Sequence, residues 1–437
     1  MGKYFGTDGV RGVAGDVLTA ELAYKIGLSI KHVLKESKVV IGKDTRASSD
    51  MLAFNLAAGA LASGVDVYMA GVVSTPMIAH FSKEEKMIGV MVTASHNPFY
   101  DNGIKLFNKG YKMLEKDDLR IEAFIDSPIP SFDKTFGTYH DYHNEVKMAY
   151  LKLYEQLEHK TIHLSVGYDS ANGANYEIAK TVLEPLCDES YQINGQPNGL
   201  NINVESGSTH LDAIKALVKE KALDIGFSFD GDGDRCLVVD HALNVYDGDK
   251  LIYALACYLK DQGRLNKNTV ILTKMSNPGI LKAFKDANIK TILTDVGDKY
   301  VTSEILKNNY TLGGENSGHI ILNHLLHTGD GLLVAVTLLN MLQSLKVPLN
   351  KLFETVNMYP QKMVNIKNVD KAILTHDDVK KVIKEADKTL GNNKLLLVRA
   401  SGTEPLIRVT ISHEDENLLD QVMESIVTTI KNLGETK

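Results

Sequence analysis

The sequence predicts an α/β protein, with three similar α/β domains built on mixed sheets and a smaller C-terminal α+β domain, arranged around a central cleft. Two observations predict this class. Short apolar runs typical of strands alternate with segments of helical periodicity, and this alternation starts afresh twice along the chain. Near the C-terminus the order changes to strand, helix, strand, turn, strand and helix. We therefore expect domains over residues 1–150, 151–248, 249–358 and 359–437.

The length and composition fit a globular protein with several cores and exclude some partner classes. By itself, a length of 437 residues suggests about three domains at roughly 150 residues each. Hydrophobic residues make up 44% of the chain and charged residues 24%, too polar for a protein that lies mainly within a membrane. The formal net charge of −7 and the lack of a basic block disfavour nucleic acid and anionic membranes as partners.

Cysteine usage and the N-terminus indicate a reducing compartment. Cys187, Cys236 and Cys257 are odd in number and far apart, so neither a disulfide framework nor a CxxC pair is available. The chain carries a charge at Lys3 before any apolar run, unlike a secretory signal. The apolar stretch 331–345 is shorter than the roughly 20 residues that cross a bilayer. We expect a cytoplasmic protein in which this stretch forms a buried helix.

The first unit shows the alternation most clearly. Strands are predicted at 38–41, 65–70 and 87–92, and helices at 48–63 and 77–85. A proline-spaced loop then precedes a further helix. The apolar residues of that helix recur at helical spacing: Val146, Tyr150, Leu153 and Leu157.

The later units repeat this pattern and then vary it. The second has predicted strands at 163–168 and 223–229 and helices at 176–186 and 211–222. The third has strands at 270–273 and 291–293 around a helix. The last has a helix at 377–390, strands at 394–398 and 406–411, and a final helix. One apolar stripe marks that final helix: Leu418, Val422, Ile426, Ile430 and Leu433.

The strongest local signal is the acidic motif Asp230-Gly-Asp232-Gly-Asp234-Arg235, at the end of a predicted strand. Carboxylates at alternate positions of extended backbone project to one side, and the glycines let the chain curl around a small hard cation. Oxygen ligands without His or Cys favour one Mg²⁺ over Zn²⁺. An EF-hand is excluded, because its sixth and twelfth positions would hold Arg235 and His241. The alternative is a solvated acidic turn, in which the carboxylates would repel one another.

A serine follows the predicted strand 87–92 in the motif Thr93-Ala-Ser95-His96-Asn97-Pro. The carboxyl end of a strand in an α/β sheet is the usual location of a reactive group. A hydrolase elbow is excluded, because G-x-S-x-G needs glycine where Thr93 and Asn97 stand. Taken alone, the motif also fits a capped turn.

Two cationic residues stand near glycine-containing motifs. Lys105 follows Ser95 within a few residues, and Arg11 lies in a glycine-rich N-terminal loop. Beside a phosphate and an acidic metal site, Lys105 could act as a general acid/base or neutralise charge, and Arg11 could bind phosphate. Each also fits a solvated surface side chain. The N-terminal glycines do not form a dinucleotide fingerprint.

Two further loops carry groups that suit a sugar phosphate. Residues 313–319 offer side chains for sugar hydroxyl or amine groups: Glu315, Asn316, Ser317 and His319. The connection after strand 394–398 offers guanidinium, hydroxyl and backbone N–H groups for a phosphate: Arg399, Ser401, Gly402, Thr403 and Arg408. No Walker A pattern is present, so nucleotide-type phosphate binding is unsupported. Each loop alone also fits an ordinary turn between strands.

Each expected domain contributes one of these motifs at the end of a strand. Together they would supply a nucleophilic serine, a Mg²⁺ site, a sugar-reading loop and a distal phosphate anchor. This combination predicts movement of a phosphoryl group within a sugar phosphate, with one phosphate held far from the metal.

In their order and number, the motifs resemble those of the α-D-phosphohexomutase superfamily over the whole chain. Beside the motifs above, the resemblance rests on residues 1–12 and on Met275-Ser-Asn277. It implies that Ser95 is the phosphoserine and that its phosphate binds Mg²⁺ together with Asp230, Asp232 and Asp234. It also implies further catalytic residues around the transferring group: Arg11, His96, Lys105 as candidate general acid/base, and Arg235. The implied sugar contacts are Glu315, Ser317 and His319, and the implied anchors of the non-reacting phosphate are Arg399, Ser401, Gly402, Thr403 and Arg408.

Within the superfamily the chain is most similar to bacterial members that interconvert glucosamine 6-phosphate and glucosamine 1-phosphate. In that reaction a glucosamine 1,6-bisphosphate serves as activator and intermediate and must reorient, and the product feeds UDP-N-acetylglucosamine and cell-wall synthesis. The implied partner is a small-molecule sugar phosphate, with neither nucleic acid nor membrane, and we expect a monomer or homodimer. The alternatives are a phosphomannomutase or phosphoglucomutase and, in another class, a metal-dependent sugar phosphatase.

Three positions depart from the superfamily pattern. Asn316 stands in place of Gln, Lys299 in place of Arg, and Ala400 in place of Pro. Lys299 cannot reproduce a bidentate arginine contact, so the resemblance fixes the reaction type more firmly than the preferred sugar.

Overall fold

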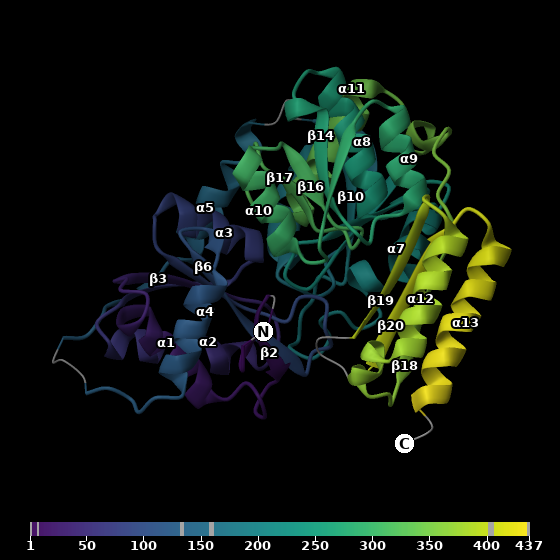
Figure 1. The fold of residues 1–437 in the computed structure, drawn as a ribbon. Helices are drawn as coiled ribbons and strands as arrows, with labels where there is room; N and C mark the ends of the chain where they lie inside the picture. Colours follow the sequence, from purple (N-terminus) through teal and green to yellow (C-terminus); the bar gives the residue numbers. More distant parts are fainter. Residues whose placement is uncertain (1, 7, 132–134, 157–160, 401–405, 435–437) are drawn as a thin grey trace.

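The computed structural model describes residues 2–6, 8–131, 135–156, 161–400 and 406–434. Within these ranges the chain forms four sheets in succession, each flanked by helices (Figure 1). Three sheets mix parallel and antiparallel strands, and the last is antiparallel. The predicted fold class, three α/β units and a smaller C-terminal α+β unit, is confirmed.

The first sheet has the order β1-β2-β6-β5-β3-β4-β8, with β7 paired to β6. Its strands are β1 (Phe5–Gly6), β2 (Gly9–Val13), β3 (Lys38–Lys43), β4 (Asp66–Val72), β5 (Ile88–Val92), β6 (Asp101–Asn108), β7 (Tyr111–Lys112) and β8 (Tyr139–Asp141). Its helices are α1 (Ala20–His32), α2 (Ser49–Ala62), α3 (Thr75–Glu84) and α4 (Glu115–Ile125). Strands β1, β2 and β6 are not evident from the sequence, because their polar and glycine residues hide the strand pattern.

The second sheet has the order β10-β9-β11-β12-β13. Its strands are β9 (Ile162–Asp169), β10 (Cys187–Ile193), β11 (Ile225–Phe229), β12 (Cys236–Asp240) and β13 (Val245–Tyr246). The helices of this part are α5 (His143–Leu151), α6 (Asn175–Leu186) and α7 (Asp212–Lys221). Helix α5 ends before Leu153, which was predicted to lie in it, and Leu157 falls outside the described residues. Leu153 is nevertheless buried, in the turn after the helix.

The third and fourth sheets have the orders β15-β14-β16-β17 and β18-β20-β19. The third comprises β14 (Thr269–Thr273), β15 (Lys290–Thr294), β16 (Leu312–Gly314) and β17 (Ile320–Leu322), with α8 (Gly248–Asp261), α9 (Pro278–Asp286), α10 (Asp298–Asn308) and α11 (Gly331–Leu345). The fourth comprises β18 (Gln361–Lys367), β19 (Lys394–Ala400) and β20 (Leu406–His413), with α12 (Asp377–Leu390) and α13 (Glu416–Gly434) side by side (Figure 1). The helices predicted at 331–345 and 377–390 are confirmed to the residue.

Helix α11 joins the second and third sheets. Asp330 caps it by accepting a hydrogen bond from the Leu333 backbone N–H at 3.0 Å, and it ends at Lys346 in a left-handed conformation. Its apolar side chains are buried on nearly all sides, and it contacts β9, β11 and β12 of the second sheet as well as β17 of the third. Each buried Leu or Val contributes roughly 1.5–3 kcal/mol relative to exposure. The helix therefore holds the two sheets in one core.

Among the described residues, no helix combines the length and the apolar character that spanning a membrane would require.

Candidate active site

Ser95 lies directly beyond the carboxyl end of β5 and is 1% exposed. Its backbone has a φ of 53°, in the left-handed region that non-glycine residues seldom adopt. Its hydroxyl donates a hydrogen bond of 2.6 Å to the Asp230 carboxylate and lies 3.4 Å from Nδ1 of His96. The predicted serine and the predicted acidic motif therefore meet, although they come from different sheets.

The three carboxylates of Asp230, Asp232 and Asp234 present oxygens within 4.8 Å of one another, and all three residues are buried. The expectation that extended backbone brings them to one side is wrong. Residues 231–234 form a turn between β11 and β12, and Gly233 has a φ of 76°. Convergence thus depends on the glycines that interrupt the acidic run.

The carboxylates of this cluster repel one another. Burial, and then the charges of Asp234 and Asp232, raise the pKa of Asp230 well above its ordinary value. The Oδ1 atoms of Asp232 and Asp234 are buried and accept no hydrogen bond. A buried carboxylate oxygen without a partner is costly, and a set of oxygen donors suits a hard divalent cation. These residues therefore fit Mg²⁺.

Lys105, on β6, supplies positive charge beside the carboxylates. Its ammonium donates to Asp232 at 2.7 Å and to Asp234 at 3.3 Å, and lies 3.2 Å from Asp8. Burial would lower the pKa of Lys105, but the three carboxylates outweigh it and raise that pKa well above its ordinary value. Thr75, at the start of α3, also donates to Asp232, at 2.5 Å. For Asp232, burial is outweighed by Lys105 and Thr75, which hold its pKa well below the usual range.

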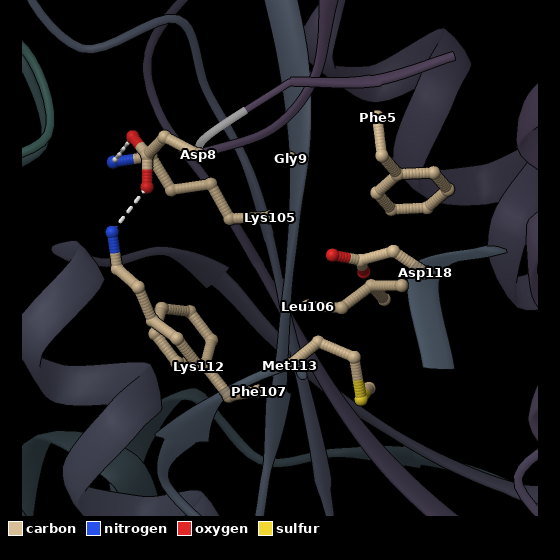
Figure 2. A pocket seen from close by; sticks show the side chains of 9 residues that line it. All are labelled: Phe5, Asp8, Gly9, Lys105, Leu106, Phe107, Lys112, Met113 and Asp118. Atoms are coloured by element: carbon tan, nitrogen blue, oxygen red, sulfur yellow. Dashed lines mark hydrogen bonds and ion pairs between the residues drawn. The ribbon is translucent and has the colours of Figure 1, made fainter. Parts of the chain in front are cut away.

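Asp8 links this cluster to the third unit, a connection that sequence analysis missed. Figure 2 shows its carboxylate between the ammonium groups of Lys105 and Lys112 at one end of a small pocket. Arg11 also donates to Asp8, at 2.5 Å. Lys112 in turn pairs with Asp298, at the start of α10. Burial would raise the pKa of Asp8, but its cationic neighbours hold that pKa well below the usual range.

His96 and Arg235 flank the serine. Nη1 of Arg235 lies 3.0 Å from Nδ1 of His96, and Nε of Arg235 lies 3.8 Å from Asp234 and 4.0 Å from Asp230. Burial, followed by the charge of Arg235, lowers the pKa of His96 to about 3. His96 is therefore neutral at pH 7 and its ring can accept a hydrogen bond from Arg235.

The predicted sugar loop lies directly beside the acidic turn. Arg235 and His319 form an isolated β-bridge, and the Cys236 N–H donates to the Gly318 carbonyl at 3.1 Å. The Glu315 carboxylate accepts a hydrogen bond of 3.1 Å from the Gly297 N–H. Oγ of Ser317 and Nδ1 of His319 are buried without a hydrogen-bond partner. Unpaired buried polar groups at this place suit a polar ligand.

The predicted phosphate loop is described only at its two ends. Ser401, Gly402 and Thr403 lie outside the described residues. Arg399 on β19 and Arg408 on β20 are directly opposite each other in the antiparallel pair. Burial and the charge of Arg408 lower the pKa of Arg399, and the Glu315 carboxylate opposes this shift. Two neighbouring guanidinium groups make this strand pair attractive to an anion.

Models of one family match all four units. These models describe the α/β/α domains I, II and III and the C-terminal domain of phosphoglucomutase/phosphomannomutase, and they match residues 2–129, 140–243, 247–359 and 363–429.

Curated relatives match along the whole length. "Phosphoglucosamine mutase" of Anoxybacillus flavithermus and that of Shouchella clausii are each 44% identical to the chain, with 99% of both chains covered. The protein of the same name from Bacillus cereus strain B4264 is 42% identical over the same share.

Solved structures share the fold. A phosphoglucomutase/phosphomannomutase family protein from Burkholderia thailandensis has a TM-score of 0.81 at 22% identity, covering 98% of this chain and 97% of its own. An N-acetylphosphoglucosamine mutase from Aspergillus fumigatus has a TM-score of 0.72 at 16% identity, covering 99% and 96%. The chain belongs to the phosphoglucosamine mutase family, within the phosphoglucomutase/phosphomannomutase proteins.

Proposed function

We propose that the protein interconverts glucosamine 6-phosphate and glucosamine 1-phosphate, with Ser95 as the phosphoryl carrier. As a member of its family it is an isomerase that moves a phosphoryl group within its substrate. One observation carries the proposal of a carrier: the Ser95 hydroxyl is buried 2.6 Å from Asp230, inside a ring of carboxylate and cationic groups. A serine in such a site can hold and release a phosphoryl group.

The reaction consists of two transfers in opposite directions. A hydroxyl oxygen of the sugar phosphate forms a bond to the phosphorus of phosphoserine as the Ser95 Oγ–P bond breaks, and the hydroxyl proton ends on Oγ. The product of this step is glucosamine 1,6-bisphosphate. After the sugar reorients, the other phosphoryl group returns to Ser95 by the reverse sequence. Added bisphosphate would therefore phosphorylate an unmodified enzyme and act as activator.

Positive charge around Ser95 would stabilise the transferring group. Asp230, Asp232 and Asp234 would hold one Mg²⁺ together with the phosphoserine, and this ion would neutralise charge that develops on the phosphoryl oxygens. Lys105 is protonated in its carboxylate cage and is suited to donate hydrogen bonds to those oxygens. Arg11 and Arg235 add two guanidinium groups nearby. The general acid/base role of Lys105 stays a prediction.

The sugar and its second phosphate would contact the third and fourth units. We assign Glu315, Ser317 and His319 to the sugar, because two of these side chains offer buried polar atoms without a partner. The non-reacting phosphate is assigned to Arg399, Ser401, Gly402, Thr403 and Arg408. The domain limits, the cytoplasmic location and the monomeric or homodimeric state stay predictions.

Turnover and protein mass together test this function. The wild-type protein should form glucosamine 1-phosphate only with Mg²⁺, faster with catalytic bisphosphate, and its intact mass should rise by one phosphoryl group. Ser95→Ala should lose both properties, whereas Ser127→Ala, which removes a serine hydroxyl from an inter-element loop, should keep both. Unchanged mass and no turnover in the wild type would contradict the proposal. Faster turnover of neutral hexose phosphates would indicate a phosphomannomutase or phosphoglucomutase, and sustained phosphate release without isomerisation would indicate a phosphatase.

A further inference from the structure

The backbone carbonyl groups of the serine loop converge on one buried guanidinium group, that of Arg46. Its Nη2 donates to the carbonyl oxygens of Ser95 and Asn97, each at 2.9 Å. Its Nη1 donates to the carbonyl oxygen of Asp101 at 3.0 Å and to that of Pro98. Arg46 is 2% exposed and lies just beyond β3, so one side chain from the loop after a neighbouring strand fixes the turn that carries Ser95.

Arg46 is itself fixed by Asp44, which is fully buried. Nε of Arg46 donates to the Asp44 carboxylate at 2.8 Å. The same carboxylate oxygen accepts from the Thr93 hydroxyl at 2.7 Å, and that hydroxyl accepts from the Ser95 N–H at 2.9 Å. Both the N–H and the C=O of Ser95 are thus tied to one ion pair. A buried ion pair is weak evidence for stability, because desolvation offsets its attraction. The directional hydrogen bonds of this ion pair are the property that apolar residues could not replace.

The second unit holds the same carbonyl group through Asn203. Its Nδ2 donates to the carbonyl oxygen of Ser95 at 2.8 Å and to that of Asn97 at 3.1 Å. Asn203 has a φ of 59° and is 8% exposed. Gly231, in the acidic turn, packs against this carbonyl, since a Cβ there would lie 2.5 Å from the oxygen. Ser95 is therefore fixed between two units.

This fixation matches the strain at Ser95. A non-glycine residue in the left-handed region is strained and persists where its surroundings over-determine it. With the backbone so held, the Ser95 hydroxyl reaches Asp230 at 2.6 Å. A change of this backbone conformation would move the hydroxyl relative to the carboxylates.

We propose that Arg46 and Asn203 are positioning residues that aim Ser95, so that its phosphoryl group passes to a sugar hydroxyl in preference to water. This inference rests on the proposed role of Ser95 as phosphoryl carrier. In both reactions the Ser95 Oγ–P bond breaks and the proton of the attacking oxygen ends on Oγ. They differ in the new bond, which joins phosphorus to the sugar oxygen in one case and to a water oxygen, giving inorganic phosphate, in the other. Small misplacement should slow the first reaction more, because only that one needs two fixed reactants.

Two substitutions test the inference in the full-length, Mg²⁺-loaded protein. Arg46→Lys keeps the charge beside Asp44 but cannot donate in four directions. Asn203→Gly removes the amide and tolerates the left-handed backbone. The matched controls are Arg120→Lys, which alters an arginine that donates to the Val33 carbonyl, and Asn288→Gly, which alters an exposed left-handed asparagine.

We expect each test variant to lower kcat by about 100-fold with KM nearly unchanged, and to raise the phosphate released per turnover. Both controls should match the wild type. If Asn203→Gly keeps its fold and shows the wild-type kcat and phosphate release, the inference is overturned. If Arg46→Lys does not fold, the result for Asn203→Gly is decisive. A loss confined to KM would also overturn it. If wild-type Ser95 gains no phosphoryl group from glucosamine 1,6-bisphosphate, the proposed function itself fails, which is a separate result.

Discussion

The Ser95 hydroxyl donates to Asp230 across 135 positions of sequence, and the two residues follow strands of different sheets. Neither the first nor the second unit contains this pair by itself. The contact therefore depends on how the two units pack, and the substitutions below probe that packing as well as the chemistry.

Asp230→Asn should change the folding stability in opposite directions, relative to the wild type, with and without Mg²⁺. Because the folded pKa of Asp230 is raised, the metal-free fold loses stability as the pH rises from the unfolded pKa, near 4, through the higher folded pKa, and this loss persists above it. At pH 7 without metal, the variant should therefore melt at or above the wild-type temperature. With Mg²⁺ at a hundred times its Kd, the wild type should gain about 2.7 kcal/mol and the variant clearly less.

Differential scanning calorimetry with EDTA and with Mg²⁺ would measure this crossover. Asp188→Asn, which removes an exposed carboxylate beside His163, serves as the control and should respond to Mg²⁺ like the wild type. Equal Mg²⁺ stabilisation of Asp230→Asn and the wild type would speak against the metal site.

Lys112→Met should loosen the link between the first and third units. Lys112 pairs with Asp8 and Asp298, and removing it leaves Asp298 without its ammonium partner. Because these side chains are 13–22% exposed, the loss should be smaller than the roughly 3–5 kcal/mol that removing one partner of a fully buried ion pair costs. Adding Asp298→Asn in the same chain should restore part of that loss, which a double-mutant cycle in urea would measure.

The same link predicts an acid dependence. Because the folded pKa of Asp8 is depressed, its contribution is present above the unfolded pKa near 4 and is lost as the pH falls through the lower folded pKa. The effect of Lys112→Met should therefore shrink in strong acid. A constant effect down to pH 2 would disagree with this account.

His327→Gln should reduce the loss of folding stability that the wild type shows as the pH falls from 7 to 5. Nε2 of His327 donates to the Gly110 carbonyl oxygen at 2.6 Å, and burial lowers the pKa of His327 to about 4. Since the ordinary pKa is 6.5, the unfolded chain takes up the proton first, and the wild type loses stability as the pH falls. Glutamine does not titrate, so the variant should gain about 2 kcal/mol relative to wild type over this range. Melting curves at pH 7, 6 and 5 would measure this difference in stability. An equal fall of the melting temperature in both proteins would contradict the prediction.

Arg399→Ala should raise KM and spare kcat. The proposed anchor binds a phosphate that does not react, and such uniform binding affects substrate and transition state alike. Loss of a charge-assisted contact suggests a rise of KM by about 10-fold or more. Lys367→Ala, an exposed cation on the same sheet, is the control. Steady-state kinetics that show a kcat loss without a KM change would argue against the anchor.

The strands and sites that follow local patterns could be predicted from the sequence. Period-2 and period-3.6 patterns identified most helices and many strands, and α11 stands out because it is apolar on nearly every face. The alternation of three aspartates with glycines indicated that the carboxylates converge, although the backbone there is a turn and not extended. Strand β6 could not be predicted, because its polar residues are buried by tertiary partners: Asn102 donates to the hydroxyls of Ser48 and Ser49.

The parts of the site that depend on distant pairing could not be predicted. Asp44 and Arg46 follow β3 and belong to no motif that indicates a function. Their role is visible only in the structure, where the serine loop packs on them. Asp8 and Asp298 meet through Lys112 although nearly 300 residues separate them in the sequence. Hydrophobic periodicity predicts which face of a helix or strand is buried. It does not predict which distant side chain packs against that face.

Helix α11 has a consequence for how the chain can be divided. It follows the third sheet in sequence yet covers β9, β11 and β12 of the second. A fragment that stops after β13 would therefore lack the helix that packs on the second sheet. The remaining fragment would contain the apolar helix α11 without the strands that bury it. Expressed apart, the two halves should aggregate. Expressed together, they should associate through this helix, because α11 packs against strands of both sheets.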